Sequence, residues 1–208
     1  AWSTTVAGLP VDPACATAAE DLARVFADFG HQVRHAAPLL PDPGPVLDLL
    51  GAVEEYRVRG PLLDSAAHLL MPETLAILQQ GRDADPQSIE AAHSARRRIV
   101  SIFRAFMAEC DLLILPATAC PAFPLRQPPP VIGGRAVTPD WPSFAPFNML
   151  ANLTGCPVAT LPVRLTVDGL PVGALVFARF GEDELLLSTL KQAEAMLGPF
   201  APPIILPR

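Results

Sequence analysis

The stretch DLLILPATACPAFP at residues 111–124 decides the fold of this 208-residue chain. Its aliphatic run at residues 112–115 is typical of a strand buried on both faces, and Pro116 ends the run. Ligands collect beyond the carboxyl ends of strands in open α/β sheets. We therefore interpret Thr118 as a candidate pocket residue. The alternative is a proline-stabilised turn that contacts no ligand.

Helix signals lie on both sides of this stretch. Asp12 and Pro13 form a helix start, because aspartate caps free backbone N–H groups and proline suits the first turn. The apolar spacing that follows them ends at Gly30. Periodicity, glycine and proline predict further helices over residues 46–59, 72–80, 87–109 and 182–197.

Three further segments carry strand signals. Residues 31–36 have the pattern of a short strand. The segments 158–167 and 171–179 flank the pair DG at 168–169, which is a strong signal for a β-hairpin. Helices interleaved with strands predict an α/β fold in which a mixed sheet is layered with helices. We expect a single unit over residues 1–208.

Residues 116–146 form a long connection rich in proline, with PPP at 128–130 and GG at 133–134. This composition predicts a stiff surface excursion rather than a core element, and long loops in compact domains are more often functional than not. Aromatic residues stand at its end, at Trp141 and Phe147, where they either line a pocket or cover the core.

Composition excludes several classes of protein. Half of the residues are hydrophobic and 17% are charged, which excludes a disordered chain. The net charge of −6, without a basic cluster beyond RRR at 96–98, argues against a nucleic-acid partner. No apolar run approaches the ~20 residues of a membrane-spanning helix, so we expect no membrane partner. No secretory signal is visible either.

The cysteines and histidines predict neither disulfides nor a metal site. Four cysteines without a Cys-x-x-Cys pair favour a reduced, cytoplasmic protein. His31 and His35 would lie ~13 Å apart on a strand, so we expect no metal, and we expect no cofactor. Cys120 or Cys156, activated by a histidine, is the rival catalytic hypothesis. No cysteine-hydrolase signature surrounds either residue, and a buried cysteine is usually inert.

Four motifs follow one another in a characteristic order: residues 111–124, WPSFAPF at 141–147, NLTGCP at 152–157 and GLPVG at 169–173. In order and spacing they resemble the C-terminal half of the amidase signature family, whose members hydrolyse or transfer carboxamides. The resemblance covers nearly the whole chain. It implies the C-terminal portion of an amidase signature fold, and a small-molecule amide substrate once an N-terminal half completes the site.

The catalytic residues of that family have no counterpart here. The resemblance implies a Ser–Ser–Lys triad in the N-terminal half, in and before a segment rich in glycine and serine. This chain has one lysine, Lys191, no Ser-Ser pair and no serine preceded by glycine. Lys191 follows every matched motif, so we predict a surface position for it. We therefore name no catalytic residue and expect the chain alone to be inactive.

The resemblance also implies which residues contact substrate. The loop that holds Trp141, Phe147 and Asn148 would shape the acyl side of the pocket, and Asn152 would lie near the cleft. The alternative for Asn152 is hydrogen bonding to the backbone near the end of a helix that stops at Gly155.

Arg96 matches the position at which the glutamine-amidotransferase branch of the family binds a substrate carboxylate. That branch has an acidic residue shortly before its Asn-Leu-x-Gly motif. No acid lies between Trp141 and Asn152 here. This difference argues against glutamine as the substrate.

Two functions remain open. The first is the C-terminal portion of an amidase-type hydrolase, supplying sheet and pocket wall without the triad. The second is a non-catalytic, truncated relative that acts as a structural or binding partner. The start at Ala1 and Trp2, without methionine, suggests trimming, processing or a fragment. Interior strands of the family would then become edges, so we expect self-association, with residues 112–115 as the exposed segment.

Overall fold

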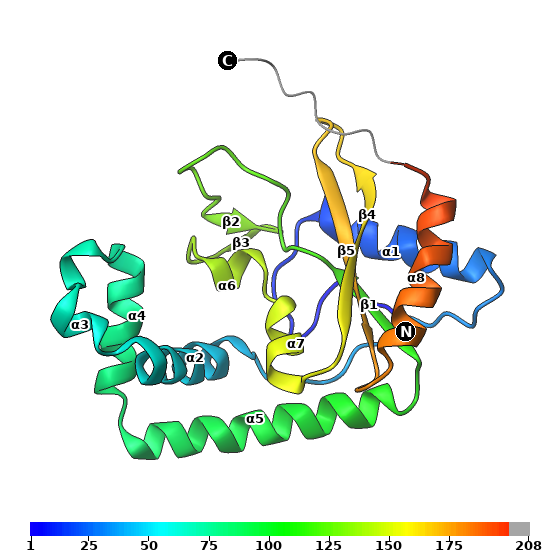
Figure 1. Ribbon diagram of the computed structural model, residues 1–208. Coiled ribbons are helices and arrows are strands. Elements are labelled where there is room, and N and C mark those ends of the chain that lie inside the picture. Colours follow the sequence, from blue (N-terminus) through cyan, green and yellow to red (C-terminus); the bar gives the residue numbers. More distant parts are fainter. Residues whose placement is uncertain (200–208) are drawn as a thin grey trace.

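A three-stranded antiparallel sheet in the order β1-β5-β4 forms the centre of the computed structural model, which describes residues 1–199 (Figure 1). Its strands are β1 (Leu112–Pro116), β4 (Val158–Leu165) and β5 (Pro171–Ala178). Both β1 and β4 pair with β5, and β4 and β5 form the predicted hairpin. The sheet and its covering helices confirm the α/β fold class. No helix among residues 1–199 is long and apolar enough to cross a bilayer.

Two isolated parallel bridges beside β1 add a parallel pairing to this antiparallel sheet, which makes it mixed. Trp2 forms one parallel bridge with Ile114 and another with His35. The strand predicted over residues 31–36 is therefore too long, because His35 alone forms a sheet bridge there.

β1 is buried, as its aliphatic run predicted, and its outer edge is not left open as we expected for a fragment. Leu113, Ile114 and Leu115 are each at most 3% exposed. The N–H of Ile114 donates to the carbonyl of Ala1, and the N–H of Ser3 donates to the carbonyl of Ile114, both at 3.0 Å. The outer edge of β1 is therefore paired. Among the described strands of this sheet, β4 is the one whose outer edge has no partner.

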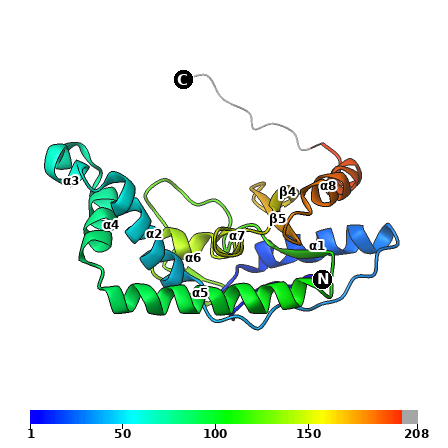
Figure 2. The same ribbon diagram turned by 60° about the horizontal axis from the view of Figure 1, so that its bottom comes forward.

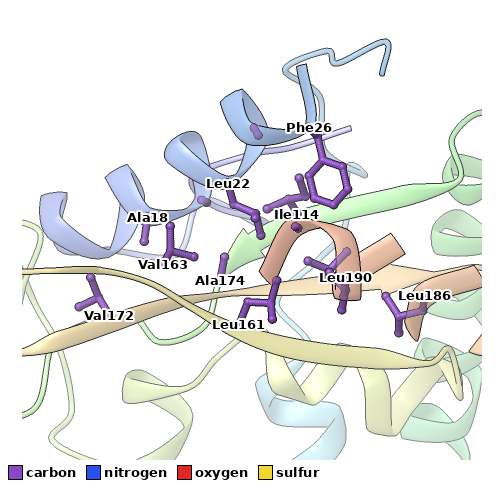
Figure 3. Close-up of a cluster of buried hydrophobic side chains, with 14 of the residues drawn as sticks. Ala18, Leu22, Phe26, Ile114, Leu161, Val163, Val172, Ala174, Leu186 and Leu190 are labelled. Atoms are coloured by element: carbon purple, nitrogen blue, oxygen red, sulfur yellow. The ribbon is translucent and has the colours of Figure 1, made fainter. Parts of the chain in front are cut away.

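Helices α1 (Pro13–Asp28) and α8 (Asp183–Leu197) cover one face of the sheet (Figure 3). α1 begins as predicted, since the carboxylate of Asp12 accepts the N–H of Ala14 at 2.8 Å. Successive side chains of a strand point to opposite faces, so β5 contributes alternate residues to this layer. They are Val172, Ala174, Val176 and Ala178.

Helices α5 (Pro86–Met107) and α7 (Asn148–Thr154) cover the opposite face. α5 begins where Asp85 accepts the N–H groups of Gln87 and Ser88. This layer contains large side chains that are at most 1% exposed. They include Phe103, Phe147, Leu150 and Phe177.

A helical arm extends away from the sheet at the N-terminal end of α5 (Figures 1 and 2). It consists of α2 (Gly44–Arg59), α3 (Leu62–Ser65), the short 3-10 helix η1 (Ala67–Leu69) and α4 (Pro72–Asp83). α2 and α4 pack closely at Gly81, where a Cβ atom would collide with the carbonyl oxygen of Ala52. The sequence predicted α2 and α4 but not α3 or η1.

The excursion over residues 116–146 contains more structure than predicted. β2 (Val131–Ile132) and β3 (Arg135–Ala136) form a small antiparallel hairpin, and α6 (Trp141–Phe144) follows. Ala119, Cys120 and Ile132 form a separate buried cluster. The prediction that the excursion holds no core element is wrong at these residues, because the hairpin folds back over the turn after β1.

Candidate functional site

The turn that follows the carboxyl end of β1 is held from three sides. The N–H of Ala117 donates to the carbonyl of Gly173 in β5 at 3.0 Å, and the N–H of Ala119 donates to the last carbonyl of α6 at 2.8 Å. The carbonyl of Ala119 accepts the N–H of Asp12, the N-cap of α1, at 2.7 Å. Three elements far apart in the sequence therefore fix this turn, which we call the β1 turn (residues 117–120).

Thr118 lies half-buried within the β1 turn. Its hydroxyl donates to the carbonyl of Cys120 at 2.8 Å and lies 3.8 Å from the Sγ atom of Cys15 in α1. Burial raises the pKa of the Cys15 thiol to about 11, so this thiol is protonated at neutral pH. The hydrogen bond of Thr118 stabilises the turn itself, and its contact with substrate remains a prediction.

The cysteines have no base beside them. Burial raises the pKa of Cys120, and Cys156 is 5% exposed. Within residues 1–199, the hydrogen bonds of cysteine side chains go to a threonine hydroxyl and a backbone carbonyl, and none goes to a histidine. A buried thiol without a base beside it is a poor nucleophile, so the geometry does not support the rival cysteine mechanism.

The two predicted pocket aromatics lie in different environments. Trp141 opens α6 and is 67% exposed. Phe147 is 1% exposed and packs in the layer between the sheet and α5. Phe147 therefore takes the core position that was the alternative for these aromatics, whereas Trp141 is free to contact a ligand. The structure does not bring the two rings together.

Asn148 and Asn152 lie one turn apart on α7, so they share one face of the helix. Asn148 is half-buried and Asn152 is exposed. Neither side chain forms a hydrogen bond to another described residue. Their amide groups are thus available to a ligand, and the backbone role considered for Asn152 has no hydrogen bond to support it among residues 1–199.

α7 is fixed at its C-terminal end. Gly155 ends the helix as predicted, in the left-handed conformation with φ of 70°. The Nε of Arg96 in α5 donates to the carbonyl of Leu153 at 3.1 Å. Arg96 therefore binds a helix terminus, and this contact holds α7 against α5.

A cavity of about 290 Å³ lies between the start of α2, residues 9–10 and residues 135–149. Its volume is near the lower end of the range for small-molecule sites. None of the five predicted site residues lines it. Its polar lining comes from Asp42, Asp48, Arg135, Thr138, Asp140 and Ser143.

The charged residues that line this cavity were not among the predicted site residues. Partial burial raises the pKa of Asp48, and the nearby carboxylates of Asp140 and Asp42 raise it further. Asp140 also accepts the N–H of Ser143, as the cap of α6. The sequence contains the cap signal at Asp140, but no local pattern places Asp48 beside it, because the two residues are far apart along the chain.

Several catalytic groups are missing from the described site. Lys191, the one lysine of the chain, is exposed on α8, in the layer opposite α5 and α7. Within residues 1–199, no group of three or more histidine, cysteine, aspartate or glutamate side chains is arranged to hold a metal ion. The described residues offer a structured wall with free amides, but no activated nucleophile.

Comparison with protein families gives a match to the family model described as Amidase, over residues 2–187. The chain is 30% identical over 214 residues to an acylamidase of Rhodococcus erythropolis. The aligned region covers 94% of this chain and 42% of the acylamidase. It is 28% identical to a 6-aminohexanoate-cyclic-dimer hydrolase of Paenarthrobacter ureafaciens, covering 92% of this chain and 42% of the relative. The chain thus spans about two fifths of the length of these relatives.

Solved structures show the same fold. A bacterial aryl acylamidase superposes with a TM-score of 0.79 at 20% identity, covering 94% of this chain and 44% of the other. A 6-aminohexanoate cyclic dimer hydrolase superposes with a TM-score of 0.76 at 22% identity and the same coverage.

Proposed function

We propose, from the premise that this chain belongs to the amidase family, that it forms the sheet and a substrate-pocket wall of a hydrolase that acts on carboxamide C–N bonds. The names of the relatives describe enzymes that act on amides. The chain corresponds to the C-terminal portion of such an enzyme, and the nucleophile comes from a preceding half. The substrate is a small-molecule amide.

The observation that carries this proposal is the attachment of the β1 turn to β5, α1 and α6. A wall that selects a substrate must hold its polar groups still, and rigid elements do so better than free loops. Thr118 belongs to the turn itself, and Trp141 stands on the α6 segment attached to it. Asn148 and Asn152 follow on α7, with amide groups that no described residue occupies.

The side chains that are present decide which catalytic tasks this chain can supply and which fall to the preceding half. Hydrolysis of an amide needs a nucleophile, a proton relay and donors for the oxyanion. The described residues supply hydrogen-bonding side chains and an exposed aromatic ring, which orient a substrate. The relay and the nucleophile are therefore assigned to the preceding half.

The second candidate function is a non-catalytic binding or structural partner. The favouring observation is that helices of this chain cover both faces of its sheet, so it has a core of its own. The coding DNA upstream of Ala1 discriminates the two functions. An in-frame lysine followed by a Gly/Ser-rich segment with a Ser-Ser pair supports the enzyme, and a start codon immediately before Ala1 supports the binding partner.

We place the protein in a reducing compartment such as the cytoplasm. Cys15, Cys110, Cys120 and Cys156 all remain free thiols. Oxidising compartments favour proteins whose cysteines are paired.

A chimera tests the proposed function. The matched part of the Rhodococcus erythropolis acylamidase is replaced by this chain, and turnover of a panel of aryl and aliphatic amides is measured. We expect turnover that disappears when the nucleophilic serine of the acylamidase portion is replaced by alanine. A folded chimera without turnover would contradict the proposal.

The same chimera tests the pocket wall. Trp141→Ala should change the ratio of kcat/KM between amides, while the melting temperature stays the same, because the ring is exposed. Leu125→Ala, at a large apolar residue of the same excursion that is 88% exposed, is the control. Equal ratios for Trp141→Ala and the parent would remove Trp141 from the pocket.

A further inference from the structure

The β2–β3 hairpin rests on the segment that precedes α1. Its turn consists of Gly133 and Gly134, both in the left-handed conformation, with φ of 54° and 77°. At Gly133 a Cβ atom would lie 2.4 Å from the carbonyl oxygen of Val11, whereas at Gly134 a Cβ atom would meet nothing within 4 Å. The close contact therefore requires glycine at the first of these positions, beyond what its backbone conformation requires.

A side chain of the hairpin strengthens the same contact. The guanidinium of Arg135 donates to the carbonyl of Gly8, which lies 127 positions earlier in the chain. Residues 8–12 are also attached to the β1 turn, because the N–H of Asp12 donates to the carbonyl of Ala119 at 2.7 Å. The hairpin and the β1 turn thus share one support, and we call residues 8–12 the hairpin seat.

The hairpin is joined to α6 as well, and the two lie together in Figure 1. Ile132 of β2 belongs to the buried cluster of the excursion, against which the ring of Phe144 in α6 packs. The N–H of Val137 donates to the carbonyl of Pro130 at 3.0 Å, which extends the hairpin towards α6. A short link then leads to Trp141, the first residue of α6. The place of the hairpin on its seat therefore determines where α6 begins in space.

We propose that Gly133 is a positioning residue, which lets the hairpin settle on its seat and thereby places the ring of Trp141 for the selection of substrate. This inference rests on the proposed function, in which Trp141 belongs to the pocket wall. Gly133 touches no substrate and acts through the ring. A side chain at Gly133 pushes the hairpin away from Val11, because Val11 directly precedes Asp12, which is itself fixed by the β1 turn and by its role as the cap of α1.

Fluorine NMR of the 208-residue chain labelled with fluorotryptophan tests the structural part of the proposal. The chain has two tryptophans, Trp2 and Trp141, so two signals are expected, and Trp141→Phe assigns them. Gly133→Ala should shift the signal of Trp141 and leave the signal of Trp2 unchanged. Gly134→Ala is the matched control, because it introduces a left-handed alanine in the same turn without the contact with Val11.

A milder variant loosens the same seat. Arg135→Ala removes the hydrogen bond to Gly8 without introducing a collision, so it should shift the signal of Trp141 by less than Gly133→Ala does. It also keeps the proposal testable if Gly133→Ala does not fold, which a melting curve shows.

Selectivity in the acylamidase chimera tests the functional part. Gly133→Ala should change the ratio of kcat/KM between aryl and aliphatic amides at least about threefold, because a small displacement of a binding group costs rate steeply. Gly134→Ala should leave this ratio close to that of the parent chimera. In a Trp141→Ala background, Gly133→Ala should have no further effect on the ratio, because the ring through which it acts is gone.

Three outcomes would overturn the proposal. A Trp141 signal that moves equally in Gly133→Ala and Gly134→Ala shows that the contact with the seat does not position the ring. Equal kcat/KM ratios in Gly133→Ala and an active parent chimera show that the seat does not affect selection. A change of full size in the Trp141→Ala background assigns selection to the cavity of about 290 Å³, which Leu9 and Pro10 of the seat line opposite β3.

Failure of the proposed function gives a different result. A folded parent chimera without turnover contradicts that function, and the role of Gly133 in selection falls with it. The fluorine signals of the chain alone still decide whether Gly133 positions the ring of Trp141.

Discussion

The two faces of the sheet are packed in different ways. Beneath α1 and α8, six of the sixteen buried residues are alanines, and we call this the alanine face. They are Ala18, Ala19, Ala23, Ala174, Ala178 and Ala193. Beneath α5 and α7, the buried residues include no alanine and three phenylalanines, and we call this the aromatic face. They are Phe103, Phe147 and Phe177.

The difference matters for the candidate site. On the aromatic face, the rings of Phe103 and Phe177 meet edge to face with centres 5.6 Å apart. α7 has seven residues, too few to be stable as an isolated helix, so it depends on this packing. The asparagines of α7 are therefore positioned by the aromatic face, and the alanine face contributes the α1 cap that holds the β1 turn.

The largest effect should come from Phe147→Ala on the aromatic face. Removing a fully buried phenylalanine leaves a cavity and typically lowers the free energy of unfolding by about 3–5 kcal/mol. Trp141→Ala, at an exposed aromatic six residues away, should change it by less than about 0.5 kcal/mol. Urea denaturation of both variants measures the contrast. Equal losses would show that the aromatic face does not extend to Phe147.

A smaller effect is expected at the end of α7. Gly155→Ala places a side chain in the left-handed region and should lower the free energy of unfolding by about 1 kcal/mol or more. Gly51→Ala in the middle of α2, where a Cβ atom meets no neighbour, should instead raise it by about 0.5–1 kcal/mol. Opposite signs in thermal denaturation are the expected result. A stabilised Gly155→Ala variant would contradict the assigned end of the helix.

Arg96→Ala should cost about 1 kcal/mol of unfolding free energy, because the carbonyl of Leu153 loses its hydrogen bond. Arg98→Ala, at an exposed arginine of the same helix, should cost less. Hydrogen exchange of the α7 amides gives a second readout, and faster exchange is expected in Arg96→Ala alone. Identical exchange in both variants would mean that Arg96 does not hold α7.

The alanine face should show a dependence on pH through Cys15. Burial raises the pKa of its thiol from 9.0 to about 11, so the folded chain holds this proton more tightly than the unfolded chain. The resulting stability is fully present below pH 9 and is lost as the pH rises towards 11. Cys15→Ala should flatten the fall of unfolding free energy between these values. The same slope in both proteins would show that this thiol titrates normally.

Much of the fold could be predicted from local signals. The aliphatic run of β1, the Asp12 cap of α1, the DG hairpin and the Gly155 stop all act within a few residues, and the structure confirms them. The short elements α3, η1, β2, β3 and α6 could not be predicted in this way. Their stability comes from packing against distant segments, as the buried cluster around Ile132 illustrates.

The candidate site was less predictable than the fold. Trp141 and Phe147 are both aromatic and lie in one motif, but the burial of one and the exposure of the other depend on where α7 begins. Asp48 and Asp140 line one cavity although they are far apart along the chain. A single sequence contains no pattern that joins such residues.

Amide turnover by the purified 208-residue chain tests the account most directly. Without a serine–lysine relay in its sequence, and with no base hydrogen-bonded to a cysteine among residues 1–199, the chain should hydrolyse none of a panel of aryl and aliphatic amides above the buffer rate. The chimera with the acylamidase portion should hydrolyse them. Turnover by the chain alone that Cys120→Ala or Cys156→Ala abolishes would contradict the account and establish a cysteine nucleophile instead.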